Sequence, residues 1–427
     1  MKLLVTLLLL LALPSSALAA AGDPDSTFGR RGTVTLKATD ADAVGFAVKV
    51  VSGNRVLAGG AAKGQFVVLK LRTTGSLDSS FGTRGQVVPA LPGSSLDGVK
   101  SLQTFRDGRI VAAGTLKLAD GTTRLVALRL LPTGEIDPSF GAGLGYALAG
   151  PGDAELSSMV MDKNGNVILG GSSGGSPLLI RLLADGTIDP TFGNAGTLSG
   201  AALGLTGRAT GLLVRDDGTL TFTVAAGPAT FTIVRVGPTG APDPTFGGTG
   251  IVNVPLSPGI GAGVGAAALR AGPANTTVVA GTDLTATGTA RGAVIRLTPA
   301  GALDPKFGNK GITRISRSGR EIRITAMVRD KSDRILLAGS GLPPESVVIR
   351  LRANGKRDNA FGTGGITYPT LGAPPGGSPI FTRLDSIDVA GSKAVLAGSA
   401  AGPGSLVRTD TGTLYTGRFA LTVSRLR

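Results

Sequence analysis

The chain alternates between short apolar runs and turn-forming residues over almost its whole length. Runs rich in Val, Leu, Ile and Thr, such as Thr33 to Leu36, Val44 to Val51 and Ile322 to Val328, are separated by Gly, Pro, Asp and Asn. Residues of this kind favour strands, and the runs have the length of strands. The pattern therefore predicts many short β-strands joined by tight turns.

One motif recurs along the chain. The pattern Asp-x-x-Phe-Gly occurs seven times, which indicates a repeat architecture in which each unit packs on its neighbours. Six copies continue to a second glycine three residues after the first, whereas the copy at Phe140 contains an insertion. The aspartates and phenylalanines of the motif are Asp25 and Phe28, Asp78 and Phe81, Asp137 and Phe140, Asp189 and Phe192, Asp243 and Phe246, Asp304 and Phe307, and Asp358 and Phe361.

Four strand-like runs belong to each repeat. Asp-Gly or Asn-Gly pairs such as Asp107-Gly108 and Asn164-Gly165 mark hairpins between two of them, because these residues tolerate the positive φ angles of a two-residue turn. The next run often ends in Ala-Gly, as from Arg109 to Gly114. Four strands per unit describe a propeller blade. We therefore predict an all-β fold: a seven-bladed β-propeller with four-stranded antiparallel blades.

Two stretches show the repeat in its fullest form, Thr74-Gly75-Ser76-Leu77-Asp78-Ser79-Ser80-Phe81-Gly82 and Asp185-Gly186-Thr187-Ile188-Asp189-Pro190-Thr191-Phe192-Gly193. They resemble the signature of the delta-60 repeat family of bacterial exported proteins, and the resemblance covers nearly the whole chain after residue 20. It implies a β-propeller. The family has no shared activity, so the resemblance implies no functional residue.

A fixed spacing predicts how the ring closes. The last run of each unit carries a basic residue, and in six units the aspartate of the motif follows eight residues later. Asp25 has no such residue before it, and Arg425 has no such aspartate after it. We expect Gly32 to Leu36 to supply the outermost strand of the seventh blade, which brings Asp25 beside Arg425. The basic residues are Lys70, Arg129, Arg181, Arg235, Arg296, Arg350 and Arg425.

The repeated side chains have a structural interpretation. The aspartate is expected to cap its own turn by accepting backbone N–H bonds, and a direct ion pair with the basic residue, which can coexist with the cap, stays open. The seven phenylalanines are expected to fill the gaps between blades.

The first twenty residues have the pattern of a secretory signal peptide. A lysine at position 2 precedes an apolar run from Leu3 to Leu13, and Ala17-Leu18-Ala19 offers a small-x-small cleavage site. No later run reaches the ~18 apolar residues of a membrane-spanning helix. We therefore expect residues 21–427 to form one propeller domain, secreted to the periplasm or the extracellular space. The chain contains no cysteine for a disulfide or a lipid anchor.

The chain is basic, with a formal net charge of +15, although only 17% of its residues are charged. The basic residues recur at repeat positions rather than in runs, which favours solubility as their main role. Attraction to anionic envelope polymers is the functional alternative. We expect a monomer whose partner is a protein or an anionic envelope polymer, with no specific nucleic acid.

Much catalytic chemistry is excluded by composition. The chain has no His, Cys or Trp, so it lacks Ser-His-Asp and Cys-His systems and imidazole or thiolate metal sites. The pairs Asp23 and Asp25, and Asp40 and Asp42, are not followed by the further ligands of a calcium loop. We predict no metal site, no cofactor and no catalytic residue.

Charged residues in the loops that enter the innermost strands are the best candidates for a binding site, because these loops ring the mouth of the channel. They lead to two hypotheses. The first is an exported, non-enzymatic scaffold or binding module for an envelope or extracellular macromolecule. The second is a carboxylate-dependent hydrolase or lyase acting on an extracellular polymer. The candidates are Asp42, Asp97, Glu155, Arg208, Glu321 and Asp385.

Overall fold

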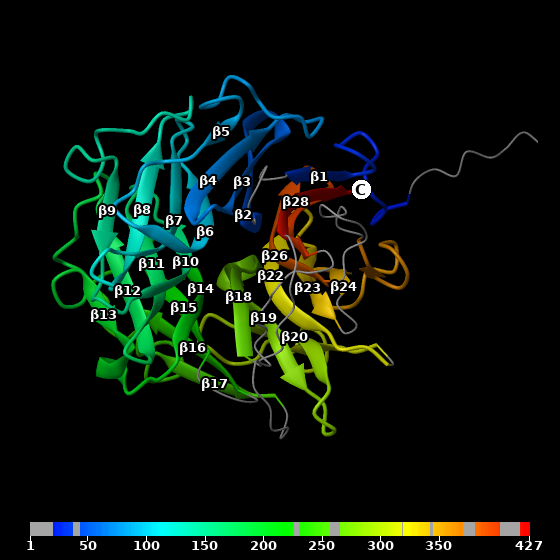
Figure 1. Cartoon of the computed structure of the whole chain (residues 1–427). Helices are drawn as coiled ribbons and strands as arrows, with labels where there is room; N and C mark the ends of the chain where they lie inside the picture. The colour runs from blue at the N-terminus through cyan, green and yellow to red at the C-terminus, as the bar shows by residue number, and fades with distance from the viewer. Residues whose placement is uncertain are drawn as a thin grey trace, which may run out of the picture.

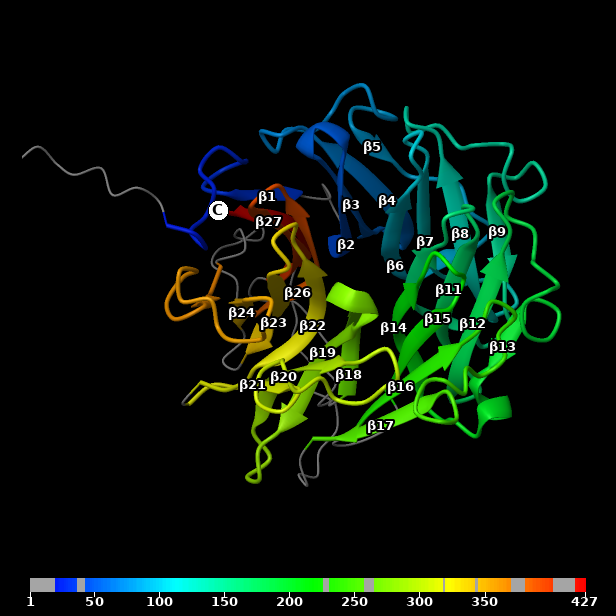
Figure 2. The same cartoon turned by 180° about the vertical axis from the view of Figure 1, so that it is seen from behind.

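The computed structural model is a ring of seven four-stranded antiparallel sheets, so the predicted seven-bladed β-propeller is confirmed. The sheets radiate from a central axis (Figure 1), and the view from behind shows the same ring (Figure 2). The structure describes residues 20–36, 43–225, 230–256, 265–317, 319–341, 345–369, 381–401 and 419–427.

Each blade consists of an innermost strand, two middle strands and an outermost strand, in that order. Blade 1 consists of β2 (Ala43–Val51), β3 (Arg55–Ala62), β4 (Gln65–Leu71) and β5 (Gln86–Val87). Blade 2 consists of β6 (Ser94–Thr104), β7 (Ile110–Lys117), β8 (Thr123–Leu130) and β9 (Tyr146–Ala149). Blade 3 consists of β10 (Glu155–Met161), β11 (Val167–Ser173), β12 (Ser176–Leu182) and β13 (Thr197–Ser199). Blade 4 consists of β14 (Arg208–Val214), β15 (Leu220–Ala225), β16 (Thr230–Val236) and β17 (Ile251–Pro255). Blade 5 consists of β18 (Gly265–Ala271), β19 (Thr277–Leu284), β20 (Ala290–Leu297) and β21 (Ile312–Ile315).

Blade 6 consists of β22 (Arg323–Arg329), β23 (Ile335–Gly341), β24 (Glu345–Leu351) and β25 (Ile366–Thr367). Blade 7 consists of β26 (Phe381–Ala390), β27 (Lys393–Ala401), β28 (Phe419–Leu426) and β1 (Thr33–Leu36). The described residues also form three short 3-10 helices in connecting turns, η1 (Ser52–Asn54), η2 (Gly200–Leu203) and η3 (Pro273–Asn275).

The ring closes through both ends of the chain, as the motif spacing predicts. Strand β1 pairs antiparallel with β28, from Thr33 opposite Ser424 to Leu36 opposite Leu421. Figure 1 shows the blue N-terminal strand beside the red C-terminal one. The seventh sheet therefore has four strands like the others, and β28 has no free edge that could pair with another chain.

The glycine of the Ala-Gly pairs marks a bulge and not a strand end. Strand β7 continues past Gly114 to Lys117, although the sequence pattern suggests an end at this glycine. Gly114 lies opposite a bulge in the inner strand β6, where a Cβ atom would be 2.3 Å from the carbonyl oxygen of Gly98. Glycine is needed because the two backbones approach so closely. The same contact occurs in six of the blades, at Gly60, Gly114, Gly171, Gly281, Gly339 and Gly398.

Seven apolar clusters form the core, one at each interface between neighbouring blades, and each contains one phenylalanine of the motif. Phe307, for example, packs between Val278 of blade 5 and Ile349 of blade 6. All seven rings are at most 1% exposed. The core is therefore divided into equal parts, and the chain can be long without one oversized core.

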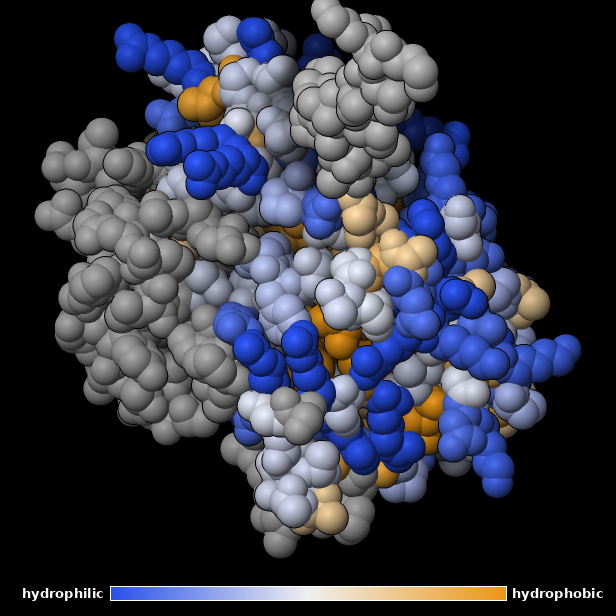
Figure 3. Space-filling view, turned by 90° about the vertical axis from the view of Figure 1, so that its right-hand side faces the viewer, coloured by the Kyte–Doolittle hydropathy of each residue, from blue (hydrophilic) through white to orange (hydrophobic). Residues whose placement is uncertain are grey.

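Polar side chains cover the rim. Figure 3 shows the molecule from the side, with hydrophilic residues over most of the described surface and hydrophobic residues in small patches between them. No helix in the described ranges has both the length and the apolar character that crossing a membrane requires.

Replacing Phe192 by alanine tests the contribution of these rings. Because Phe192 is 1% exposed, we expect Phe192→Ala to lower the free energy of unfolding by about 3–5 kcal/mol. Urea unfolding followed by far-ultraviolet circular dichroism measures the loss. The control is Leu144→Ala, since Leu144 is 59% exposed and its loss should stay within about 0.5 kcal/mol. Equal losses in the two variants would contradict this role.

Candidate functional site

Each blade interface is held by an ionic cluster built on the repeat. Arg296 Nε in β20 lies 2.7 Å from Asp304 Oδ2, and its guanidinium stacks 4.9 Å from the centre of the Phe307 ring. Its Nη1 donates to the carbonyl oxygen of Ala353 in the next blade, at 2.8 Å. The other oxygen of Asp304 accepts the backbone N–H of Lys306. One arginine thus connects its own strand, the following turn and the neighbouring blade.

The cluster recurs around the ring. In six of the seven interfaces an arginine Nε lies 2.7 Å from the aspartate of the motif, and the same guanidinium stacks 4.5–4.9 Å from the ring centre of the phenylalanine. The pairs are Arg129 with Asp137, Arg181 with Asp189, Arg235 with Asp243, Arg296 with Asp304, Arg350 with Asp358, and Arg425 with Asp25.

The first blade departs from this pattern. Asp78 pairs with Arg55 at 3.5 Å and with Arg72 at 3.8 Å. Lys70 lies over the Phe81 ring, and its Nζ donates to Pro132 O at 3.2 Å. The eight-residue spacing suggested a direct ion pair between Lys70 and Asp78, and this expectation was wrong. A lysine has one compact charged group, whereas the guanidinium fork can reach carboxylate and carbonyl together.

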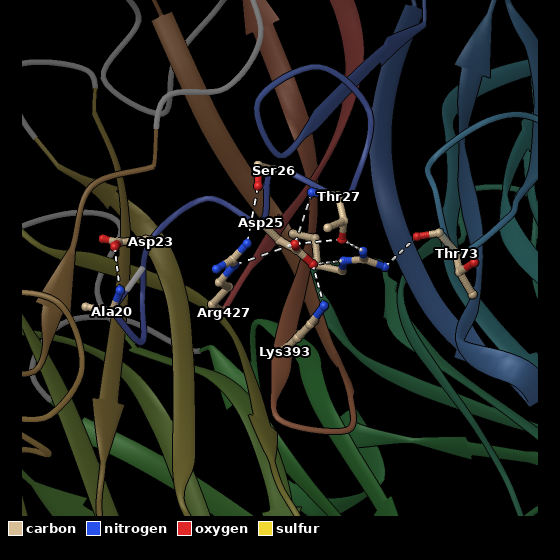
Figure 4. A network of polar contacts seen from close by, with 9 residues as sticks. Ala20, Asp23, Asp25, Ser26, Thr27, Thr73, Lys393 and Arg427 are labelled. Atoms are coloured by element: carbon tan, nitrogen blue, oxygen red, sulfur yellow. Dashed lines mark hydrogen bonds and ion pairs between the residues drawn. The ribbon is translucent and has the colours of Figure 1, made fainter. Parts of the chain in front are cut away.

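The closing interface carries the densest network (Figure 4). Asp25 Oδ2 lies 2.7 Å from both Arg425 Nε and Lys393 Nζ, and Arg427 Nε is 3.7 Å from Oδ1. Thr27 donates to Oδ1 through both its backbone N–H and its hydroxyl, so Asp25 caps its turn and pairs with cations at once. The residue is fully shielded from solvent although it lies near the edge of the ring, because these side chains cover it.

The electrostatics of Asp25 follow from these contacts. Burial alone would raise the pKa of Asp25, but the hydrogen bonds from Lys393 and Thr27 and the charge of Arg425 more than offset it. The pKa therefore lies well below the usual range of an aspartate, and the carboxylate stays ionised in the folded protein.

The described candidates at the channel mouth lie in or just before the inner strands of five separate blades. Three of them lie beside a cation of their own segment: Asp97 beside Lys100 at 3.3 Å, Glu321 beside Arg323 at 3.3 Å, and Asp385 beside Arg383 at 2.6 Å.

The other candidates stand alone or fall outside the described chain. Glu155 and Arg208 are exposed, and each is the first residue of its inner strand. Asp42 lies outside the described residues.

Asp385 differs from the other mouth residues. Burial raises its pKa, and the charges of Arg383 and Lys100 offset this only in part. Its Oδ2 is buried and has no hydrogen-bond partner. A carboxyl with a raised pKa is a candidate for proton transfer. Both charged groups that act on its pKa, Arg383 and Lys100, are cations, and Lys100 also lies 3.3 Å from Asp97.

Deeper in the channel, the seven inner strands place one residue each at the same level. These residues, which we call the channel ring, occupy equivalent positions in the ladder between first and second strands. All seven line one cavity of about 320 Å³. Sequence reasoning missed this ring, although alignment of the seven inner strands would have shown polar residues in four repeats where three have Val or Leu. Its members are Lys49, Gln103, Val160, Leu213, Arg270, Val328 and Asp388.

A larger pocket of about 820 Å³ opens between blades 4 and 5. Arg235 and Asp243 line it, but both already build the ionic cluster. Thr219 stands where blades 1, 2 and 7 have Arg55, Arg109 and Lys393, so the pocket exists because a long side chain is replaced by a short one. We interpret this pocket as the space that the shorter Thr219 side chain leaves at a repeat position. In the described parts of the chain, no three acidic, His or Cys residues lie close enough to hold a metal ion.

Comparison with known sequences supports a β-propeller repeat family. Residues 54–81, 106–140, 163–192 and 275–307 match a family model described as "Domain of unknown function (DUF5122) beta-propeller". Each matched segment ends at a phenylalanine of the motif. A search of curated protein sequences gives no match.

Comparison with solved structures supports the fold. A catalytically inactive virginiamycin B lyase from Staphylococcus aureus with quinupristin is 13% identical, with a TM-score of 0.51 over 92% of this chain and 98% of that chain. The selenomethionine-substituted lyase from the same organism is 12% identical, with a TM-score of 0.50 and the same coverage. At these identities the likeness shows the propeller fold alone.

Neutralising Asp25 tests the closing interface. Asp25→Asn leaves Arg425 and Lys393 beside an uncharged group, so we expect the free energy of unfolding to fall by about 3 kcal/mol. The matched control is Asp243→Asn, because the Asp243 side chain is 17% exposed and has one arginine partner; its loss should be about 1 kcal/mol. Urea unfolding of both variants measures the difference. A loss at Asp25 no larger than at Asp243 would refute the special role of closure.

The ionic clusters also predict how stability depends on pH. The pKa values of Asp25, Asp78, Asp137, Asp189, Asp243 and Asp304 lie below their ordinary value. A lowered native pKa stabilises the fold above the unfolded-state value of about 3.9 and stops doing so as pH falls through the native value. We expect the melting temperature to stay nearly constant from pH 7 to about 5 and to fall steeply below about 4.

Thermal unfolding between pH 7 and 2 measures this dependence. The chain has no histidine, so no side chain with an ordinary pKa titrates between pH 5 and 8. The Asp25→Asn variant should show a shallower loss below pH 4. A wild-type melting temperature that falls mainly between pH 7 and 5 would be inconsistent with the ionised clusters.

Proposed function

We propose that this chain is an exported, non-enzymatic β-propeller of the delta-60 repeat family that works as a monomeric binding module outside the cytoplasm. The leader-like pattern of residues 1–20 supports export, and most of that segment lies outside the described residues. The ionic and aromatic side chains of the repeat support a scaffold, because ring building uses them. The partner is an anionic polymer of the cell envelope or its surroundings.

The observation that carries this proposal is a pair of arginines on one aromatic ring. The guanidinium groups of Arg317 and Arg320 lie 4.7 and 5.2 Å from the centre of the Tyr368 ring. Arg317 is exposed and makes no ion pair within the described part of the chain, whereas Arg320 pairs with Glu345. The loops after β21 and β25 hold these residues, and both of these outermost strands run toward the face of the channel mouth.

The surrounding sequence is basic. Residues 306–334 contain nine Lys or Arg and three Asp or Glu, so basic residues are denser here than in the chain as a whole, and five of these arginines form ion pairs. Stacking on Tyr368 fixes the direction of the two guanidinium groups and reduces the entropy they lose on binding. Such a surface attracts a polyanion through its field and offers it a preformed contact.

Retention on an anionic polymer tests the proposal. Residues 21–427 are applied to immobilised dextran sulfate and eluted with a salt gradient. We expect elution at a salt concentration well above that of a near-neutral propeller, and roughly threefold weaker binding for Arg317→Gln. The control Arg106→Gln removes the same charge from an exposed hairpin and should change binding less. Equal effects of the two substitutions, or no retention, would overturn this function.

A second candidate function rests on Asp385 alone. A carboxylate-dependent hydrolase or lyase acting on an extracellular polymer would use this carboxyl as a general acid, since its pKa is raised. Polymer cleavage in a panel of polysaccharides, abolished by Asp385→Asn and retained in Asp97→Asn, would establish this alternative and refute the non-enzymatic function. We expect no cleavage by the wild-type protein.

A further inference from the structure

The charges of the channel ring are distributed unevenly around the axis. On one side, Lys49 of blade 1 and Asp388 of blade 7 lie 3.4 Å apart, with Gln103 of blade 2 next to them. On the other side, Arg270 of blade 5 stands between Leu213 of blade 4 and Val328 of blade 6. The cavity therefore has a paired cation on one wall and a single cation among apolar side chains on the other.

The positive charges of the cavity exceed its negative charges. Lys49, Lys100 and Arg270 line it, with Asp388 as the carboxylate among its lining residues. Asp388 already pairs with Lys49 and accepts the backbone N–H of Val50 at 2.9 Å. Lys100 reaches Asp97, which lies at the mouth. Arg270 is thus the cation with the least compensation.

The environment of Arg270 is unusual for a guanidinium. Protein surrounds it, because the inner strands enclose the channel, and yet the open cavity leaves the side chain accessible to solvent. Burial lowers the pKa of Arg270, and the charge of Asp388 offsets this only in part. Its Nη1 donates to the carbonyl oxygen of Leu269, and within the described chain it forms no ion pair. Most of its five donors are available to a ligand.

We propose that the channel ring binds a small organic carboxylate, with the carboxylate on Arg270 and the hydrocarbon part against the apolar members of the ring. A planar guanidinium suits a carboxylate because two parallel N–H···O bonds can form. Leu213 and Val328 flank Arg270 and supply the apolar wall. Gln103 and the Lys49–Asp388 pair face it across the cavity, where a polar end of the ligand could bind. The volume of about 320 Å³ fits a molecule of few carbon atoms.

This site is separate from the macromolecular surface of the proposed function. It uses the inner strands β2, β6, β10, β14, β18, β22 and β26, whereas Arg317, Arg320 and Tyr368 belong to loops that follow outer strands. Binding of a small carboxylate in the channel and binding of a polyanion on the surface can therefore occur independently, and each has its own test.

The test compares pentanoate with its neutral isostere pentanamide, using saturation-transfer difference NMR on residues 21–427. We expect saturable binding of pentanoate and at least roughly tenfold weaker binding of pentanamide. Arg270→Leu should also weaken pentanoate binding at least about tenfold, because leucine already occupies the equivalent position in blade 4 and should be accepted by the fold. The control Arg106→Leu makes the same substitution in an exposed hairpin and should leave binding unchanged.

Several outcomes would overturn the proposal. These are the absence of saturable pentanoate binding, equal binding of pentanamide, and unchanged pentanoate binding in Arg270→Leu. Inorganic phosphate that binds as tightly as pentanoate, measured by its competition with pentanoate, would show a site for any anion and would refute the proposal of an organic carboxylate. Melting temperatures of the two leucine variants, measured in parallel, separate loss of the site from loss of the fold.

Discussion

In six of the seven interfaces an arginine pairs with the aspartate of the motif, and in five of them it also donates to a carbonyl oxygen of the next blade. The geometry of the ring depends on these links. Transfer of a guanidinium out of water is unfavourable unless its charge and donors are matched. In this ring the carboxylate of the motif, the face of the phenylalanine and a carbonyl oxygen of the next blade provide the match. The glycine that follows the phenylalanine of the motif adds a second link. At all seven interfaces its backbone N–H donates to a backbone carbonyl oxygen of the following blade, with N···O distances of 2.7–2.9 Å. A closed ring requires equal steps, and six nearly identical arginine clusters, together with the glycine N–H bond at all seven interfaces, favour them.

Closure imposes a cost that the other interfaces avoid. At five interfaces the arginine and aspartate are eight residues apart, so they meet whenever the strand and its turn form. Asp25 and Arg425 are 400 residues apart, and their contact requires the whole ring. The loss of chain entropy is correspondingly larger. Lys393 and Arg427 add two further cations at this one interface, and β1 adds a strand, so the contact without local support has the most partners.

Features encoded by local spacing could be predicted from the sequence. The strand runs, the seven turns and the step from arginine to aspartate are all short-range, and together they specified the blade count and the closing strand. Lys70 was misassigned because spacing does not distinguish an ammonium from a guanidinium fork. The bulge opposite Gly114 could not be seen, since it depends on the register between two strands. The raised pKa of Asp385 depends on burial among elements far apart in the chain.

The channel ring was missed for a different physical reason. Side chains at the blade interfaces must be apolar and of fixed size, because the opposite blade fills the remaining space. Side chains of the channel ring also border the open cavity, so residues as different as Val160, Arg270 and Asp388 can occupy equivalent positions in one fold. Folding therefore does not explain which residue stands where in the channel ring. A guanidinium stands between leucine and valine without an ion pair in the described structure, and the carboxylate ligand that we propose would supply one.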